Sequence, residues 1–290
     1  MTEPFDFGAF LERLMDRRRL DAAMLSRAAG LAGGELSSVL RGGAPGPSVL
    51  RGLAPALELH AADLFVIAGA RVPDDLAPVD PEAGSDVHRL VRVAVALPDE
   101  RRPELAHVVG SMPQEERVLP VPPPRPHERY PGGPGALLMR LVRNRNLGWT
   151  ATAHTFLAAT GRYWSAATYG GIGRGTVPLT DELLADFCAV LDVCGEDLAA
   201  LTGITPATPR STGPCPGEVA GLIWDVRRLT AAQLERAVEY AESLRDRARP
   251  LTPPDAPTPP ASPDIGLPPT ASPGGRIPHS GGSADSSKNR

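Results

Sequence analysis

The feature of this 290-residue chain that most constrains its fold is an internal repeat. RLMDRRRL at 13–20 is similar to RLVRNRNL at 140–147, and residues 47–69 are similar to residues 181–203. A third match pairs 90–112 with 222–244, and the copies stay about 130 residues apart throughout. Three matches in the same order indicate a duplication, so both halves should fold alike.

Apolar residues in the first copy recur at helical spacing, and alternation with a period of two is almost absent. Five short apolar stripes occupy residues 1–70, and glycines follow the second and third of them at Gly30, Gly42 and Gly43. Pro55 falls inside the fourth predicted helix, where it should remove a backbone bond and bend the helix. These patterns predict an all-α fold.

Proline-rich stretches divide the chain. Residues 113–134 predict a linker, and residues 248–290, rich in Pro, Ser, Thr and Gly, predict a disordered tail. The segments between them predict two tandem five-helix domains, at 1–70 and 135–204. A pair of helices follows each domain, at 85–112 and 217–247.

One stretch of the first copy, DAAMLSRAAGLAGGELSSVLRG at 21–42, resembles the helix-turn-helix of the Cro-like (XRE) family of bacterial regulators. Gly30 permits the turn, while Leu25, Leu36 and Val39 fix the angle at which the second helix is presented to a major groove. The resemblance covers residues 9–70 well and 136–203 loosely. Its positions are matched without insertion or deletion by Asp21, Leu25, Ala28, Gly30, Leu36, Val39 and Gly42.

The resemblance implies binding to double-stranded DNA through Ala22, Arg27, Gly33, Gly34, Ser37, Ser38 and Arg41. The two glycines carry no side-chain donor and should weaken the first helical turn. The serines can pair with several bases and discriminate poorly. Most of the charge would come from Arg27 and Arg41. The run Arg17–Arg19 either contacts phosphate or is a solvated helix end.

The second copy departs from this pattern. Its second helix is predicted from Thr152 to Gly161, after an insertion of about four residues, and Ala167 and Gly170 stand where larger apolar residues belong. Three aromatic residues could stack on a partner or ligand, but the preferred interpretation is that they refill the core. They are Tyr163, Trp164 and Tyr169. GGIGRG at 170–175 is predicted to be a loop rather than a phosphate site.

Several functions find no support in the residues. A net charge of -4 argues against coating nucleic acid by bulk charge. No spacing of His or Cys suits a metal, no cofactor motif is present, and no constellation suggests an enzyme. The three cysteines are predicted to be buried free thiols: Cys188, Cys194 and Cys215. No membrane-spanning segment or signal peptide is expected. The expected location is the cytoplasm.

Two functional hypotheses follow. The first is a bacterial transcription regulator whose N-terminal helix-turn-helix binds DNA, with the second copy pairing with it or with another subunit. The second is a protein–protein interaction module that keeps the fold and has lost base readout. A homodimer or another protein partner stays open under both.

Overall fold

The computed structural model describes residues 6–32, 34–117, 123, 125–205, 207 and 216–248. Within these ranges the chain forms fourteen α-helices and three short 3₁₀ helices, and no strand is present there. The all-α prediction is therefore confirmed for the described part of the chain. The predicted tail beyond Ala248 and the middle of the predicted Pro-rich linker, from residue 118 to 122, lie outside these ranges.

Five helices occupy the first 70 residues. Asp6 caps the first by accepting a hydrogen bond from the Ala9 amide at 3.0 Å, and Pro47 opens the fourth, where a missing N–H costs nothing. Pro55 lies inside the fourth helix, one residue before its end, so the bond it removes falls in the last turn. The helices are α1 (Phe7–Arg18), α2 (Ala22–Ala28), α3 (Glu35–Leu40), α4 (Pro47–Ala56) and α5 (Ala61–Ile67).

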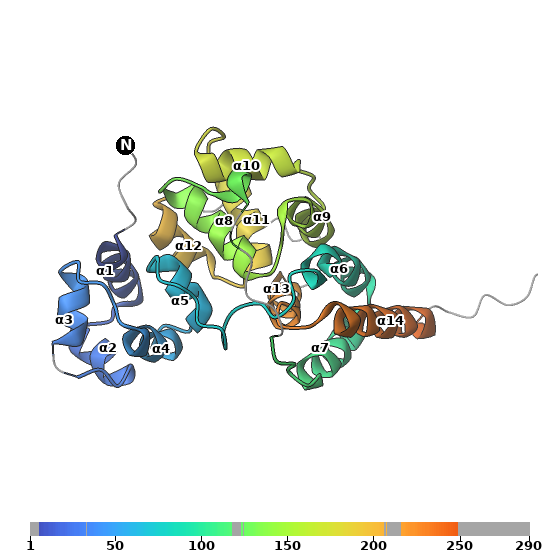
Figure 1. Ribbon diagram of the computed structural model, residues 1–290, viewed down its shortest axis with the longest axis horizontal. Coiled ribbons are helices and arrows are strands. Elements are labelled where there is room, and N and C mark those ends of the chain that lie inside the picture. The colour runs from blue at the N-terminus through green and yellow to red at the C-terminus, as the bar shows by residue number, and fades with distance from the viewer. Residues whose placement is uncertain are drawn as a thin grey trace, which may run out of the picture. The chain divides into compact units, whose positions relative to one another are not determined.

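Two helices follow, then five more, then a final pair (Figure 1). Glycines in the left-handed conformation end three of these helices, at Gly161, Gly175 and Gly203. The first pair is α6 (Val87–Ala96) and α7 (Arg102–Ser111). The second group of five is α8 (Pro134–Asn144), α9 (Trp149–Thr160), α10 (Ala166–Arg174), α11 (Asp181–Leu191) and α12 (Gly195–Thr202). The last pair is α13 (Pro216–Val226) and α14 (Ala231–Ala248).

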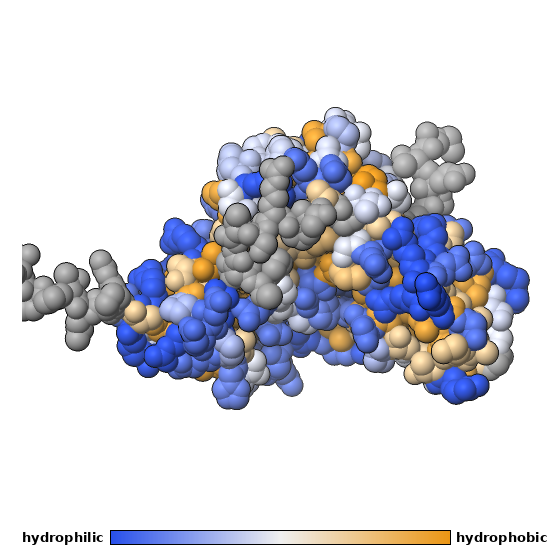
Figure 2. Space-filling view, turned by 180° about the vertical axis from the view of Figure 1, so that it is seen from behind, coloured by the Kyte–Doolittle hydropathy of each residue, from blue (hydrophilic) through white to orange (hydrophobic). Residues whose placement is uncertain are grey.

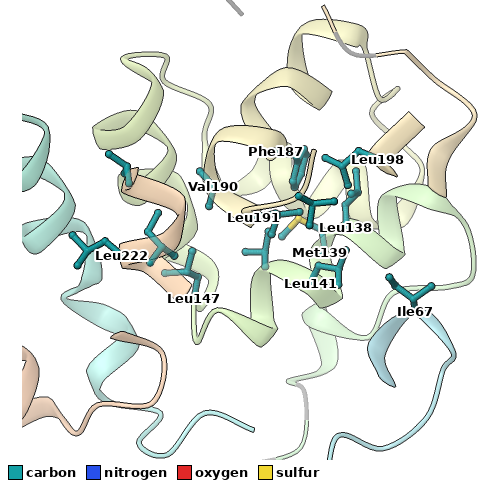
Figure 3. Packing of buried hydrophobic residues seen from close by; sticks show 14 of the residues in the cluster. Ile67, Leu138, Met139, Leu141, Leu147, Phe187, Val190, Leu191, Leu198 and Leu222 are labelled. Carbon is teal, nitrogen blue, oxygen red and sulfur yellow. The ribbon is translucent and has the colours of Figure 1, made fainter. Parts of the chain in front are cut away.

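One hydrophobic cluster runs through the described helices. Figure 3 shows its part around α8, α11 and α12, with Ile67 of α5 at its edge. On the face seen in Figure 2, hydrophilic side chains dominate and apolar ones form smaller patches. None of the described helices is long and apolar enough to cross a lipid bilayer.

The basic end of α1 packs against the second group of five helices. Arg18 donates from Nη2 to Asp197 Oδ2 at 2.7 Å and from Nη1 to the Leu57 carbonyl at 2.7 Å. Arg13 donates to the Ala200 carbonyl at 2.8 Å, and Arg17 lies 3.5 Å from the Glu196 carbonyl. Arg18 is therefore neither a phosphate contact nor part of a solvated helix end, as the two interpretations of Arg17–Arg19 had it. It joins two groups of helices.

A buried polar cluster joins α5 to the end of α8. Asp63 Oδ1 accepts hydrogen bonds from Asn144 Nδ2 at 2.7 Å and from Arg145, whose side chain is fully buried. Arg145 also donates to the Leu191 carbonyl. A buried ion pair of this kind adds little net stability but is costly to break, because the remaining charge stays in a dry interior.

Trp224 of α13 lies at the same junction. The His60 ring stacks on the Trp224 ring, with 3.5 Å between the ring centres. The Arg227 guanidinium carbon lies 3.7 Å from the centre of the Trp224 ring. Burial lowers the pKa of Arg227 to about 9, so it remains charged at neutral pH. The Arg145 guanidinium carbon also lies 4.8 Å from the centre of the Trp224 ring. The first five helices, the end of α8 and the last helical pair therefore meet at one indole ring.

Candidate nucleic-acid interface

The α2–turn–α3 segment is built from local hydrogen bonds. Asp21 caps α2 by accepting from the Met24 amide at 2.7 Å, and Gly30, with a φ of 63°, lets the chain leave the helix. The Ala32 amide donates to Glu35 Oε2 at 2.8 Å, which ties the turn to the start of α3. Asp21 therefore fixes the start of α2, and Glu35 fixes the start of α3 against the turn.

Close backbone contacts fix where α3 lies. Leu25, Leu36 and Val39 are almost fully buried, as the sequence predicts. A Cβ at Gly8 of α1 would lie 2.7 Å from the Val39 carbonyl oxygen, and one at Gly52 of α4 would lie 2.5 Å from the Ala29 carbonyl oxygen. Both glycines therefore let a neighbouring helix come up against the α2–turn–α3 segment.

The other side of this segment faces solvent. Of the residues expected to contact DNA, the exposed ones are Ala22, Arg27, Gly34, Ser37, Ser38 and Arg41. Gly33 lies outside the described residues. No ion pair joins Arg27 or Arg41 to another described side chain. The segment thus presents two uncommitted guanidinium groups and two hydroxyls.

Gly34 has a different role from the one predicted. It is the N-cap of α3, with a φ of 98°, and lies outside the helical turns. The expected loss of helix stability at this position is therefore wrong, because glycine is the residue best suited to that backbone conformation.

The sequence did not indicate that two further residues belong to this surface. Glu35 is exposed at the first position of α3, and Met24 on α2 is 51% exposed. Glu35 lies three residues after Ala32, whose amide it accepts from, and this spacing is typical of a helix cap. The spacing can be seen in the sequence, but the glycines at 33 and 34 predict a weak helix start instead. Its charge opposes phosphate contact at that end of the helix.

The third helix of the second group, α10, is buried where α3 is exposed. Five consecutive residues, Tyr169 to Gly173, are buried. Tyr169 and Ile172 fill the core with the same spacing as Leu36 and Val39. The prediction that Ala167 and Gly170 stand at those apolar positions is therefore wrong by two residues. GGIGRG is not a loop either, because α10 includes residues up to Arg174.

Side chains from three directions cover the glycines of α10. A Cβ at Gly170 would lie 2.0 Å from the Trp149 ring, one at Gly171 2.5 Å from Val177, and one at Gly173 2.5 Å from the Tyr130 ring. The glycines therefore let neighbouring side chains pack closely against the middle of α10, where residues 169 to 173 are buried, whereas the middle of α3 exposes Ser37 and Ser38.

The three aromatic residues of the second group of five helices have separate roles. Tyr169 is buried against Phe156 at 4.7 Å between ring centres, and burial raises its pKa. Trp164 is half-buried and donates to Asp186 at 3.1 Å, whereas Tyr163 is 64% exposed. The prediction that all three refill the core is correct for Tyr169 and wrong for Tyr163.

The two cysteines that the structure describes show no arrangement for metal binding. Cys188 is half-buried, and Cys194 is exposed and caps α12 by accepting from the Asp197 amide at 3.4 Å. The expectation of buried thiols is therefore wrong for Cys194, and Cys215 lies outside the described residues. Among the residues that the structure describes, no group of three or more His, Cys, Asp or Glu side chains could hold a metal ion.

Comparison with known proteins adds no relative. No protein family model matches the chain, and neither a curated protein nor a solved structure is significantly similar to it. Its function has to be inferred from its own residues.

Proposed function

We propose that this chain is a DNA-binding transcription regulator of the Cro-like (XRE) kind that reads duplex DNA with α3. The observation that carries the proposal is the exposed side of α3, where Ser37, Ser38 and Arg41 face solvent while Leu36 and Val39 hold the helix from behind. A short helix held at an angle by a preceding helix and a tight turn is the usual means of entering a major groove.

The DNA contact would be weakly charged. Arg13, Arg17 and Arg18 donate to groups near or on α12, so they contribute little to a DNA face. Arg19, Arg27 and Arg41 remain, together with the hydroxyls of α3. Such a surface would depend on few phosphate contacts, and its affinity would fall with salt less steeply than that of a strongly basic protein.

We further propose that the two groups of helices are tandem copies of one domain. In each copy the second residue of the first helix is a glycine that touches a carbonyl of the third helix: Gly8 to Val39 and Gly135 to Ile172. In each copy the third helix is followed by a left-handed glycine, Gly42 or Gly175. The second copy, with α10 covered, would serve as a scaffold for the first.

The alternative, a protein–protein interaction module, has one observation in its favour. Beside Arg27, α2 exposes Ala22, Ala23 and Met24, and α3 exposes Glu35. An apolar group and a carboxylate suit a protein partner better than they suit phosphate. This alternative uses the same surface, so the two functions are separated by the partner that binds.

A salt titration of DNA binding tests the proposal. The full chain would be titrated into a fluorescein-labelled mixed-sequence duplex over a range of salt concentrations, with anisotropy as readout. Arg27→Ala combined with Arg41→Ala should weaken binding and reduce the salt slope by about one or two ion equivalents. If the unaltered chain does not bind the duplex at low salt, the interaction module replaces the regulator.

A further inference from the structure

A pocket of about 320 Å³ lies in the second domain, away from the proposed DNA surface. It is formed where the segment before α8 crosses α8 and the start of α9. Its volume is at the small end of the range of ligand sites in proteins.

The pocket has aromatic and apolar walls that are held in place. Tyr130 and Trp149 line it, and each packs against a glycine of α10, at Gly173 and Gly170. Met139 and Leu147 add apolar surface. Rings fixed in this way suit a flat apolar group, because little side-chain freedom is lost when the group binds.

The charge of the pocket is positive. Glu128 is matched by Arg143, whose Nη1 lies 2.6 Å from its Oε2. Arg140 also lines the pocket, and no described carboxylate pairs with it: its Nη2 donates to the Tyr130 carbonyl at 3.2 Å. A guanidinium has five N–H donors in a fixed fork, so Arg140 can also bind a carboxylate through two parallel bonds.

The start of α9 adds to this charge. Its N-cap, Gly148, has no side chain to accept from the first-turn amides, and Gly148 and Trp149 line the pocket. The exposed amides of a helix N-terminus carry partial positive charge. Aromatic walls, a guanidinium and this helix start therefore surround the same space.

We propose that this pocket binds a small aromatic carboxylate, with the ring between the apolar walls and the carboxylate on Arg140. The inference is independent of DNA binding, since none of the residues that form the pocket lies in the first domain. It assigns the second domain a ligand, beyond its proposed role as a scaffold.

The test is calorimetric titration of the full chain with 1-naphthoate, and with 1-naphthamide as a neutral ligand of the same shape. Naphthoate should bind saturably and naphthamide much more weakly. Arg140→Gln should weaken naphthoate binding about tenfold, whereas Arg236→Gln, an equal change of charge on the exposed side of α14, should leave it unchanged.

Three results would overturn the proposal. They are no saturable binding of naphthoate, equal binding of inorganic phosphate, and equal affinities for the two arginine variants. Arg140 is exposed, so its variant should fold, and an unchanged circular dichroism spectrum would show that it has. DNA binding by the same preparations is measured separately and does not enter this test.

Discussion

The third helices of the two five-helix groups differ in what surrounds them. Residues 35, 37 and 38 of α3 are exposed, whereas residues 169 to 173 of α10 are all buried. In each group a carbonyl of the third helix lies close to a glycine of the first helix. In each group a glycine in the left-handed conformation follows the third helix. The difference therefore lies in what covers the helix rather than in how it is held.

Aligning the two helices at these shared features makes the contrast specific. Leu36 then corresponds to Tyr169 and Val39 to Ile172, and all four are buried. Ser37 and Ser38 correspond to Gly170 and Gly171, which lie under Trp149 and Val177. Small residues at the outward positions allow neighbouring side chains to close over the helix, so the same frame can expose its third helix or bury it.

The largest expected effect concerns the polar cluster that joins the two groups. Asp63→Ala would leave the fully buried Arg145 without its carboxylate, and we expect the unfolding free energy to fall by about 3–5 kcal/mol. Urea denaturation followed by circular dichroism measures it. Arg51→Ala, which removes an exposed ion pair with Asp75, should cost about 1 kcal/mol or less. Similar losses in both variants would mean that the Asp63 cluster is not a dry link between the groups.

The next effect tests the shared glycine contact. Gly135→Ala would place a Cβ 2.2 Å from the Ile172 carbonyl oxygen, and Gly8→Ala would place one 2.7 Å from that of Val39. Forcing an added methyl group into packed structure costs about 1–3 kcal/mol, so both variants should be destabilised, Gly135→Ala more strongly. Thermal melting of both proteins measures this. A stabilised variant would contradict the close approach, since alanine is otherwise the better helix former.

How far the sequence predicts this molecule depends on the kind of contact. The helices of the first group are predicted well because their apolar periodicity, Asp21 cap and Gly30 stop are local signals. The exposed positions 22, 27, 37, 38 and 41 follow from the same periodicity. These features need no knowledge of the rest of the chain.

Other features could not be predicted because they depend on distant residues. The partner of Arg18 is Asp197, and local charge patterns do not indicate it. The burial of Gly170 and Gly173 depends on Trp149 and on Tyr130 from the predicted linker. Glycine-rich GGIGRG is typical of a loop by composition, and tertiary packing makes it helical instead.

The smallest expected effect is a pH dependence that arises at the contact between α6 and α9. His88 of α6 lies 5.0 Å, ring centre to ring centre, from His154 of α9. Burial lowers the pKa of His88 from 6.5. The hydrogen bond to the Ser85 carbonyl and the charge of Asp86 oppose this shift, whereas His154 and Arg92 add to it. Because the folded state binds the proton less well than the unfolded chain does, this group contributes stability above pH 6.5 that is lost as the pH falls further.

His88→Asn should therefore flatten the decline of thermal stability between pH 7.5 and 5.5 relative to the unaltered chain. Melting temperatures across that range measure the effect, and His107→Asn, on the exposed side of α7, serves as the control. A decline as steep in His88→Asn as in the control would assign the pH dependence to other groups.

The central claim, that α3 reads DNA and α10 does not, is tested most directly by the arginines at the C-terminal ends of the two third helices. Arg41 directly follows α3 and Arg174 ends α10, each is exposed, and each precedes a left-handed glycine. The measurement is the salt dependence of duplex binding by Arg41→Ala and Arg174→Ala. We expect Arg41→Ala to weaken binding and reduce the slope by about one ion equivalent, with Arg174→Ala matching the unaltered chain. Equal losses in both variants, or a loss only in Arg174→Ala, would contradict the claim.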